Sequence, residues 1–208
     1  MRVESNKRED YLQDLPEICL SHPLLKRLSQ KLFNNTKNEI EIIQRAFLYV
    51  RDQIDHSWDI QADEVTKTSV EVLRSGHGIC YAKANLLTGL LRSVGIPTGY
   101  CYQKLRLFDD EEKRYCIHAL NAVYLEILEK WIRIDARGNK PGVNAQFSLD
   151  KEQLAFEPNT NLGEQDYIVI FTRPNRKTML VLDKSKDALR MYAVSYTHLR
   201  AHETELHL

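Results

Sequence analysis

The 208-residue sequence lacks an excess of either charge, because 29 Lys and Arg residues balance 29 Asp and Glu residues. Nucleic-acid binding draws on counterion release at a basic surface, so this balance argues against a nucleic-acid partner. The chain also lacks any apolar run near the length of about 18 residues that a membrane span needs. Its first residues, MRVESNKREDYLQDLPE, lack the apolar stretch of a secretory leader. We therefore expect a cytoplasmic protein with no membrane partner.

Cysteine is scarce, and no two cysteines form a C-x-x-C pair. The four are Cys19, Cys80, Cys101 and Cys116. In a chain of this size without a leader we expect them to be reduced. A zinc site built from Cys80, Cys101, Cys116 and His118 remains an alternative, although the wide separations argue against it. No calcium-loop or cofactor-binding pattern is present, so we expect no metal and no cofactor.

The sequence lacks internal repeats and low-complexity blocks, and its length suits one domain. We predict a single domain over residues 1–194. It comprises a helical lead-in (1–55), a core (56–147) and a C-terminal extension (148–194). The last stretch, SYTHLRAHETELHL (195–208), has no periodicity and is similar to translated adapter or vector sequence. We expect it to be non-native and assign its histidines no role.

Helical periodicity is clearest in two segments of the first half. In residues 38–55, apolar side chains recur every three or four positions, and Asn38 precedes them as a candidate N-cap. Residues 79–94 carry a dense apolar stripe, typical of a helix packed against a sheet. Shorter helices are predicted in HPLLKRLSQKLF (22–33) and DKEQLAF (150–156).

Capping signals mark another short helix in TSVEVLRSG. Thr68 and Glu71 have the spacing of a capping box, and Gly76 follows as a terminating glycine. The helix over 79–94 is in turn followed by Gly95 and Pro97, which end it.

After Pro97 the hydrophobic period changes from 3.6 to 2. Three segments rich in aromatic and β-branched residues predict strands, at 98–108, 114–127 and 130–137. The charge run DDEEKR (109–114) between the first two predicts a solvated hairpin loop, and DYIVIF (166–171) predicts a further strand. The second and third strands form a hairpin centred at 128–129. The pattern predicts an α+β fold with an antiparallel meander.

Cys80 stands at the start of the 79–94 helix, in SGHGICYAKANLL. A buried thiol is the ordinary interpretation of a single cysteine. A helix N-terminus, however, favours an anion through its unpaired N–H groups and the helix dipole. The same N–H groups can stabilise an oxyanion during acyl transfer. We expect Gly76 and Gly78 to let the loop backbone approach a substrate closely.

A base and its orienting carboxylate are predicted on the meander. His118 lies within the second strand, in YCIHALNAV, and Asp135 ends the third, in WIRIDARGN. Pairing of these strands around the short LEK connection brings the two residues side by side. A carboxylate can then accept from one imidazole nitrogen while the other nitrogen takes the thiol proton.

A G-x-C at a helix start, a strand histidine and an aspartate at the end of the next strand, in this order, resemble the transglutaminase-like superfamily of papain-related folds. The segments CYAKANLLTGLLRSVGIP and HALNAVYL…KWIRIDARGN carry the resemblance over residues 56–147. It implies that Cys80 is the nucleophile, that His118 is the general base and acid, and that Asp135 orients the imidazole. The implied chemistry is acyl transfer through a thioester on a peptide, protein or small amide substrate.

The sequence departs from the family pattern in two places. The family often has an aromatic residue after its histidine, whereas Leu120 and Asn121 occupy that neighbourhood here. Arg74 stands where a papain-like glutamine would donate to the oxyanion. Candidates for that second donor are Trp58, Gln61 and Gln103.

For several other side chains, a purely structural role is the alternative to a functional one. Tyr81 either lines the cleft or lies on the helix surface, and Trp131 packs on the sheet. His56 and His77 are expected to be exposed loop histidines. The alternative function is a catalytically silent binding or scaffold module of the same fold. Neither the acyl acceptor nor the oligomeric state has a signal in the sequence.

Overall fold

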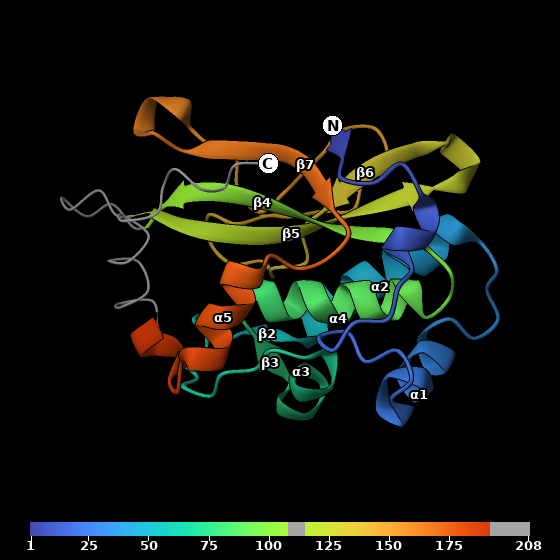
Figure 1. Cartoon of the computed structure of the whole chain (residues 1–208), viewed down its shortest axis with the longest axis horizontal. Helices are drawn as coiled ribbons and strands as arrows, with labels where there is room; N and C mark the ends of the chain where they lie inside the picture. The colour runs from blue at the N-terminus through green and yellow to red at the C-terminus, as the bar shows by residue number, and fades with distance from the viewer. Residues whose placement is uncertain (108–114, 192–208) are drawn as a thin grey trace.

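The computed structural model describes residues 1–107 and 115–191, so the predicted charged loop (109–114) and the predicted non-native tail (195–208) lie outside the described residues. Within these ranges an antiparallel-rich sheet lies over a layer of helices, which confirms the predicted α+β class (Figure 1).

The main sheet has five strands in the order β1-β7-β4-β5-β6. They are β1 (Arg2–Val3), β4 (Thr98–Arg106), β5 (Tyr115–Leu125), β6 (Lys130–Ile134) and β7 (Gln165–Phe171). All neighbours pair antiparallel except β1 and β7, which pair parallel. A separate parallel pair joins β2 (Asp55–His56) to β3 (His77–Gly78).

Five α-helices and three short 3₁₀ turns complete the described part. The helices are α1 (Pro23–Leu32), α2 (Glu39–Gln53), α3 (Ser69–Ser75), α4 (Cys80–Arg92) and α5 (Arg176–Lys184). The 3₁₀ turns are η1 (Arg8–Tyr11), η2 (Glu126–Leu128) and η3 (Thr160–Leu162). In the described ranges, no helix combines the length and apolar character needed to cross a membrane.

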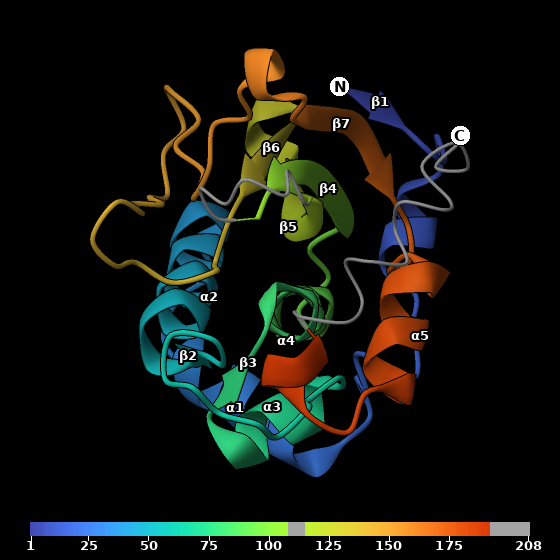
Figure 2. The same ribbon diagram turned by 90° about the vertical axis from the view of Figure 1, so that its left-hand side faces the viewer.

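Helix α4 is the centre of the molecule. Figure 2 shows it surrounded by the sheet on one side and by α1, α2, α3 and α5 on the others. All 13 of its residues are buried, which explains the dense apolar stripe of the sequence. Asn121 on β5 fastens the sheet to this helix, because its Nδ2 donates to the Thr88 Oγ1 at 2.9 Å. The N-terminus of α4 is thereby held in a fixed position under the strands.

The predicted caps of the neighbouring helices are present. Asn38 accepts a hydrogen bond from the backbone N–H of Glu41 at the start of α2. Thr68 and Glu71 form a complete capping box on α3, and Gly76 ends that helix in the left-handed conformation at φ 74°. Local sequence therefore sets where these helices begin and end.

The predicted meander is confirmed in strands β4, β5 and β6. In the β5–β6 hairpin, Asn121 opposes Ile134 and Leu125 opposes Lys130. The centre of this hairpin lies one residue earlier than the sequence indicates. The turn contains η2 and ends at Glu129, whose φ of 48° is left-handed.

The predicted helix over residues 150–156 is wrong. This segment is irregular and pairs through a bridge between Gln146 and Gln153. Its backbone N–H and C=O groups form hydrogen bonds with other parts of the chain. In a helix, the same groups would bond to one another. The N–H of Ala155 donates to Asp135, and the carbonyl of Gln153 accepts from Gln146. Helix α5 and strand β1, by contrast, formed without having been predicted.

Candidate active site

Cys80 is the first residue of α4 and is 8% exposed. The preceding Ile79 is extended and provides no side-chain cap. The other four α-helices all begin with a capping side chain, namely His22, Asn38, Thr68 and Asn175. The first N–H groups of α4 are therefore not used by a cap, and the positive end of the helix dipole lies beside the Cys80 thiol.

The two glycines before Cys80 have structural roles in turning the chain and in packing. Gly76 ends α3 in the left-handed region. A Cβ on Gly78 would lie 3.0 Å from Thr66 Oγ1 and 3.1 Å from Ala82 Cβ, so only glycine fits beneath the start of α4 without a shift. The expected close approach of a substrate to this backbone stays a prediction.

His118 and Asp135 form a buried pair at the mouth of the hairpin. The Nε2 of His118 lies 2.8 Å from Oδ2 of Asp135, and the side chains are 4% and 1% exposed. Asp135 directly follows the last residue of β6 and accepts two backbone hydrogen bonds as well, from Arg137 and Ala155, both at 3.1 Å. The carboxylate is thus fixed by three donors.

This pair sets the charge of both groups. Burial by itself lowers the pKa of His118, but the Asp135 carboxylate and the neighbouring Cys80 more than offset burial and raise that pKa to about 10. Burial acts to raise the pKa of Asp135, but the His118 ring and the backbone donors outweigh it and lower that pKa. An imidazolium–carboxylate pair is favoured at neutral pH.

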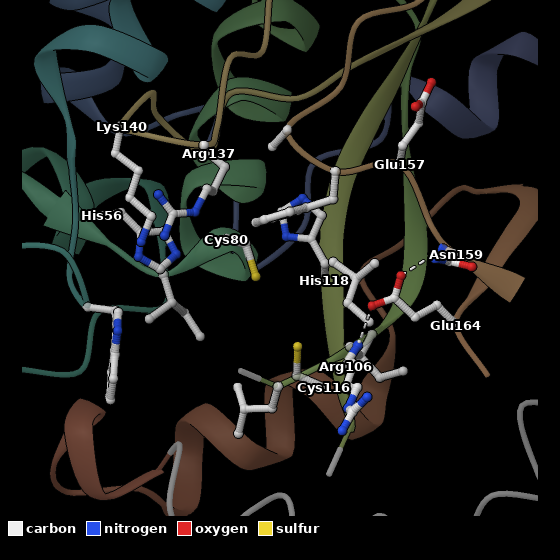
Figure 3. Close-up of a pocket in the computed structure, with 18 of the residues that line it drawn as sticks. His56, Cys80, Arg106, Cys116, His118, Arg137, Lys140, Glu157, Asn159 and Glu164 are labelled. Atoms are coloured by element: carbon white, nitrogen blue, oxygen red, sulfur yellow. Dashed lines mark hydrogen bonds between the residues drawn. The ribbon is translucent and has the colours of Figure 1, made fainter. Parts of the chain in front are cut away.

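Cys80 and His118 meet in one cavity. Its volume is about 560 Å³, and both residues line it (Figure 3). Because Asp135 occupies Nε2, the Nδ1 of His118 is the nitrogen left for the thiol. Phe156 packs edge-on against the imidazole, with ring centroids 5.0 Å apart, and limits its rotation. The three residues predicted from the sequence are therefore brought together.

The other predicted site residues divide into two groups. Trp58 and Tyr81 line the cavity, and the hydroxyl of Tyr81 donates to the Ile117 carbonyl at 2.8 Å. Gln61 is exposed and turns back to the Trp58 carbonyl. Gln103 is fully buried opposite His118 on β4 and reaches toward the Phe156 carbonyl rather than the cavity. Neither glutamine is among the residues that line the cavity.

Several cavity residues have no counterpart in the sequence-based prediction. His56, Arg137 and Lys140 line the cavity. Asp59 pairs with the Arg137 guanidinium and accepts from Lys140 Nζ at 2.8 Å. Burial acts to raise the pKa of Asp59, but these two cations lower it to about 2.

His56 and His77 are buried, contrary to the expectation of exposed loop histidines. They lie on β2 and β3, whose two-residue pairing is too short to leave a periodic signal in the sequence. The Nδ1 of His77 lies 2.9 Å from the Ser57 hydroxyl, which fastens the two segments beside Cys80.

The family model of the transglutaminase-like superfamily matches residues 26–136, more than half of the chain. The chain belongs to this superfamily. The matched residues include Cys80, His118 and Asp135 at the positions described above. No curated protein matches the chain.

Three solved structures are similar to this chain at low sequence identity. The chain covers less than half of the length of each of them. A putative cysteine protease from Cytophaga hutchinsonii is 18% identical, with a TM-score of 0.48, over 64% of this chain and 43% of the other. The periplasmic domain of TgpA from Pseudomonas aeruginosa is 15% identical, with a TM-score of 0.46, over 62% and 46%. A structure described as a TGase is 16% identical, with a TM-score of 0.44, over 79% and 45%.

The structure also bears on the zinc-site alternative and on the position of the papain-like glutamine. In residues 1–107 and 115–191, no three His, Cys, Asp or Glu side chains are placed to hold a metal ion. Cys101 packs in a different apolar cluster from Cys80, with Tyr11 and Leu120. Arg74, at the papain-like glutamine position, is exposed on α3 and does not line the cavity.

Proposed function

We propose that the protein transfers acyl groups from amide substrates through a thioester on Cys80, as a peptidase, an amidase or a transglutaminase-type enzyme. The observation that supports this most is the convergence of Cys80, at the uncapped N-terminus of α4, with the buried His118–Asp135 pair in one cavity. A nucleophile, a base and an orienting carboxylate are the parts that such catalysis needs.

The first half of the reaction forms the acyl-enzyme. The Cys80 proton rests on Nδ1 of His118 in a thiolate–imidazolium pair, because the pKa of His118 is raised to about 10, and the thiolate attacks the amide carbonyl carbon. The tetrahedral intermediate collapses as the C–N bond breaks, and His118 returns the proton to the leaving amine. Asp135 stabilises the imidazolium throughout, because its carboxylate is held 2.8 Å from Nε2.

The second half releases the acyl group. Water attacks the thioester in a hydrolase, and a primary amine attacks it in a transglutaminase, with His118 taking the acceptor's proton in either case. The cavity is large enough for an extended side chain and part of its backbone, which suits a peptide or small amide.

A catalytically silent binding module of the same fold is the competing function. A binding module needs no reactive thiol. The raised pKa of His118 instead favours a charged ring, which stabilises a thiolate on Cys80. The two functions differ in the reactivity of Cys80, which can be measured without knowing the substrate.

The test is the rate of alkylation by iodoacetamide at each cysteine, followed by mass spectrometry. Cys80 should react faster than Cys19 and Cys101, and Cys80→Ala should remove the fast phase. His118→Ala should slow the reaction at Cys80 by about 10²–10⁴-fold. Equal rates in wild type and His118→Ala would refute the proposal. Glutamine-donor peptides with and without a primary amine then separate amine transfer from hydrolysis.

A further inference from the structure

His56 lines the same cavity as Cys80 but takes no part in the His118–Asp135 pair. Its side chain is buried, with 7% of the residue exposed. The Nδ1 atom is completely buried and has no hydrogen-bond partner in the described part of the chain. Buried polar atoms in folded proteins are nearly always paired, so a solitary one beside a reactive thiol requires an explanation.

The position of His56 relative to Cys80 is fixed by the β2–β3 pair. His56 opposes Gly78, which lies two residues before Cys80. The N–H of Ser57 donates to the Gly78 carbonyl at 3.2 Å and holds the two segments together. In the view of Figure 3, Cys80 lies between His56 and His118. All three side chains line the cavity.

The environment of His56 favours the neutral form of its ring at neutral pH. Burial lowers its pKa well below 6.5, and the positive charge of Arg137 lowers it further. A neutral imidazole carries one N–H and one bare nitrogen. A buried N–H without an acceptor is less tolerable than a bare acceptor. We therefore place the proton on Nε2 and leave the enclosed Nδ1 bare.

We propose that His56 is the second oxyanion donor, using its Nε2–H to stabilise the negative oxygen that forms when Cys80 attacks a carbonyl. This inference rests on the proposed function. When the Sγ–C bond forms, the C=O electron pair moves onto oxygen. It returns when the leaving group departs. The first N–H groups of α4 provide the other donors, since no side chain caps them.

The surrounding charges suit an anion at this place. Arg137 and Lys140 contribute two positive charges to the cavity lining, and Asp59 cancels one of them. Of the side chains expected from the sequence to be second donors, Trp58 alone lines the cavity. His56 and Trp58 are therefore the two side chains to compare.

Two reagents distinguish an oxyanion donor from a residue that merely supports the fold. Iodoacetamide reacts at its CH₂ group, where iodide leaves and no oxygen gains charge. p-Nitrophenyl acetate acylates the thiol through a tetrahedral oxyanion and releases p-nitrophenolate. The rates of both reactions at Cys80 are measured in wild type, His56→Ala, His56→Gln and Trp58→Phe, each on the full chain.

His56→Ala should slow acylation by about 10²–10³-fold while alkylation stays near the wild-type rate. His56→Gln keeps an N–H donor and should recover part of the acylation rate. Equal slowing of both reactions in His56→Ala would overturn the proposal, because it would indicate a structural role. Selective loss in Trp58→Phe with none in His56→Ala would overturn it too, and would assign the role to the indole.

The control that separates this inference from the proposed function is His118→Ala. An activated thiol requires that this variant slows both reactions. If alkylation is independent of His118, the proposed function itself fails. If it depends on His118 and only the His56 results disagree, the thiol site stands and the oxyanion assignment falls.

Discussion

His118 and His56 line the same cavity and are both buried, yet their pKa values move in opposite directions. Burial disfavours the charged ring in each case. For His118, the Asp135 carboxylate at 2.8 Å outweighs burial and raises the pKa to about 10. For His56, burial is the main cause and the cation of Arg137 is the largest contribution from a neighbouring charge; both lower the pKa, which falls well below 6.5.

The difference teaches that the neighbouring charge, rather than the residue type or its burial, decides what a histidine can do here. A ring held charged can stabilise a thiolate and give its proton to a leaving amine. A ring held neutral can only donate or accept a hydrogen bond. The predictions below alter one side of this comparison at a time.

The largest effect is expected from Asp135→Asn, which should make His118 resemble His56. Without the carboxylate, burial dominates and the pKa of His118 should fall below 6.5. Alkylation of Cys80 at pH 7 should slow by about 10²–10⁴-fold. Removing one partner of a buried pair should also lower the free energy of unfolding by about 3–5 kcal/mol. Urea unfolding and alkylation kinetics measure the two effects.

The control for this prediction is Asp183→Asn, which removes a carboxylate from a surface pair with Lys67. Both measurements should stay near the wild-type values in that variant. An Asp135→Asn protein that alkylates at the wild-type rate would show that His118 does not depend on the carboxylate.

Opposite pH dependences of stability should follow from the two histidines. The stabilisation from the raised pKa of His118 is complete below 6.5 and is lost as the pH rises through about 10. The stabilisation from the lowered pKa of His56 is complete above 6.5 and is lost as the pH falls toward its folded value. Urea midpoints of wild type, His118→Gln and His56→Gln from pH 5 to 9 test this.

Relative to wild type, His118→Gln should therefore cost more free energy of unfolding at pH 6 than at pH 9. His56→Gln should cost more at pH 7.5 than at pH 5. Parallel pH profiles for the two variants would contradict the comparison.

A smaller effect is expected from Arg137→Met, which removes the cation beside His56. The pKa of His56 should rise but stay below 6.5, because burial is the larger cause of its depression. Histidine resonances followed by NMR titration measure the shift. Lys140→Met serves as the matched control, since it removes the other cation that pairs with Asp59 and should shift His56 less.

Cys116 tests whether a thiol in the same cavity reacts without a histidine partner. Burial raises the pKa of Cys116 to about 12, so this thiol should stay protonated and unreactive near neutral pH. Cys116→Ser should leave the alkylation rate of Cys80 unchanged. Labelling at Cys116 in wild type as fast as at Cys80 would argue against selective activation.

Among the variants expected to lose stability, the smallest loss is expected from Thr68→Ala, which removes the cap of α3. The free energy of unfolding should fall by about 1 kcal/mol. The alkylation rate of Cys80 should not change, because this cap lies outside the cavity. Thermal melting measures the loss of stability, and alkylation kinetics measure the reactivity of Cys80. Together they show how a purely structural substitution affects each quantity.

The pairing of His118 with Asp135 could be predicted because it depends on a single hairpin. The predicted centre of that hairpin is one residue too late, yet the pair still forms. Asp135 lies just beyond the end of β6, where the backbone no longer pairs with β5 and its position does not depend on the register of the hairpin. The helix predicted at 150–156 failed for the opposite reason, since its backbone bonds go to distant partners such as Asp135 and Gln146.

The sequence by itself determined the features that depend on neighbours within about one helical turn or one hairpin: the caps of α2 and α3, the change of period at Pro97, and the chain order of Cys80, His118 and Asp135. Tertiary structure alone decided that His56 is buried in the cavity that Cys80 lines, that Gln61 is exposed, and that Arg137 pairs with Asp59. These outcomes depend on pairings such as His56 with Gly78, in which two short segments meet without any local pattern. The charge of each histidine follows from those distant contacts, because a neighbouring ion shifts a buried pKa whatever its separation along the chain.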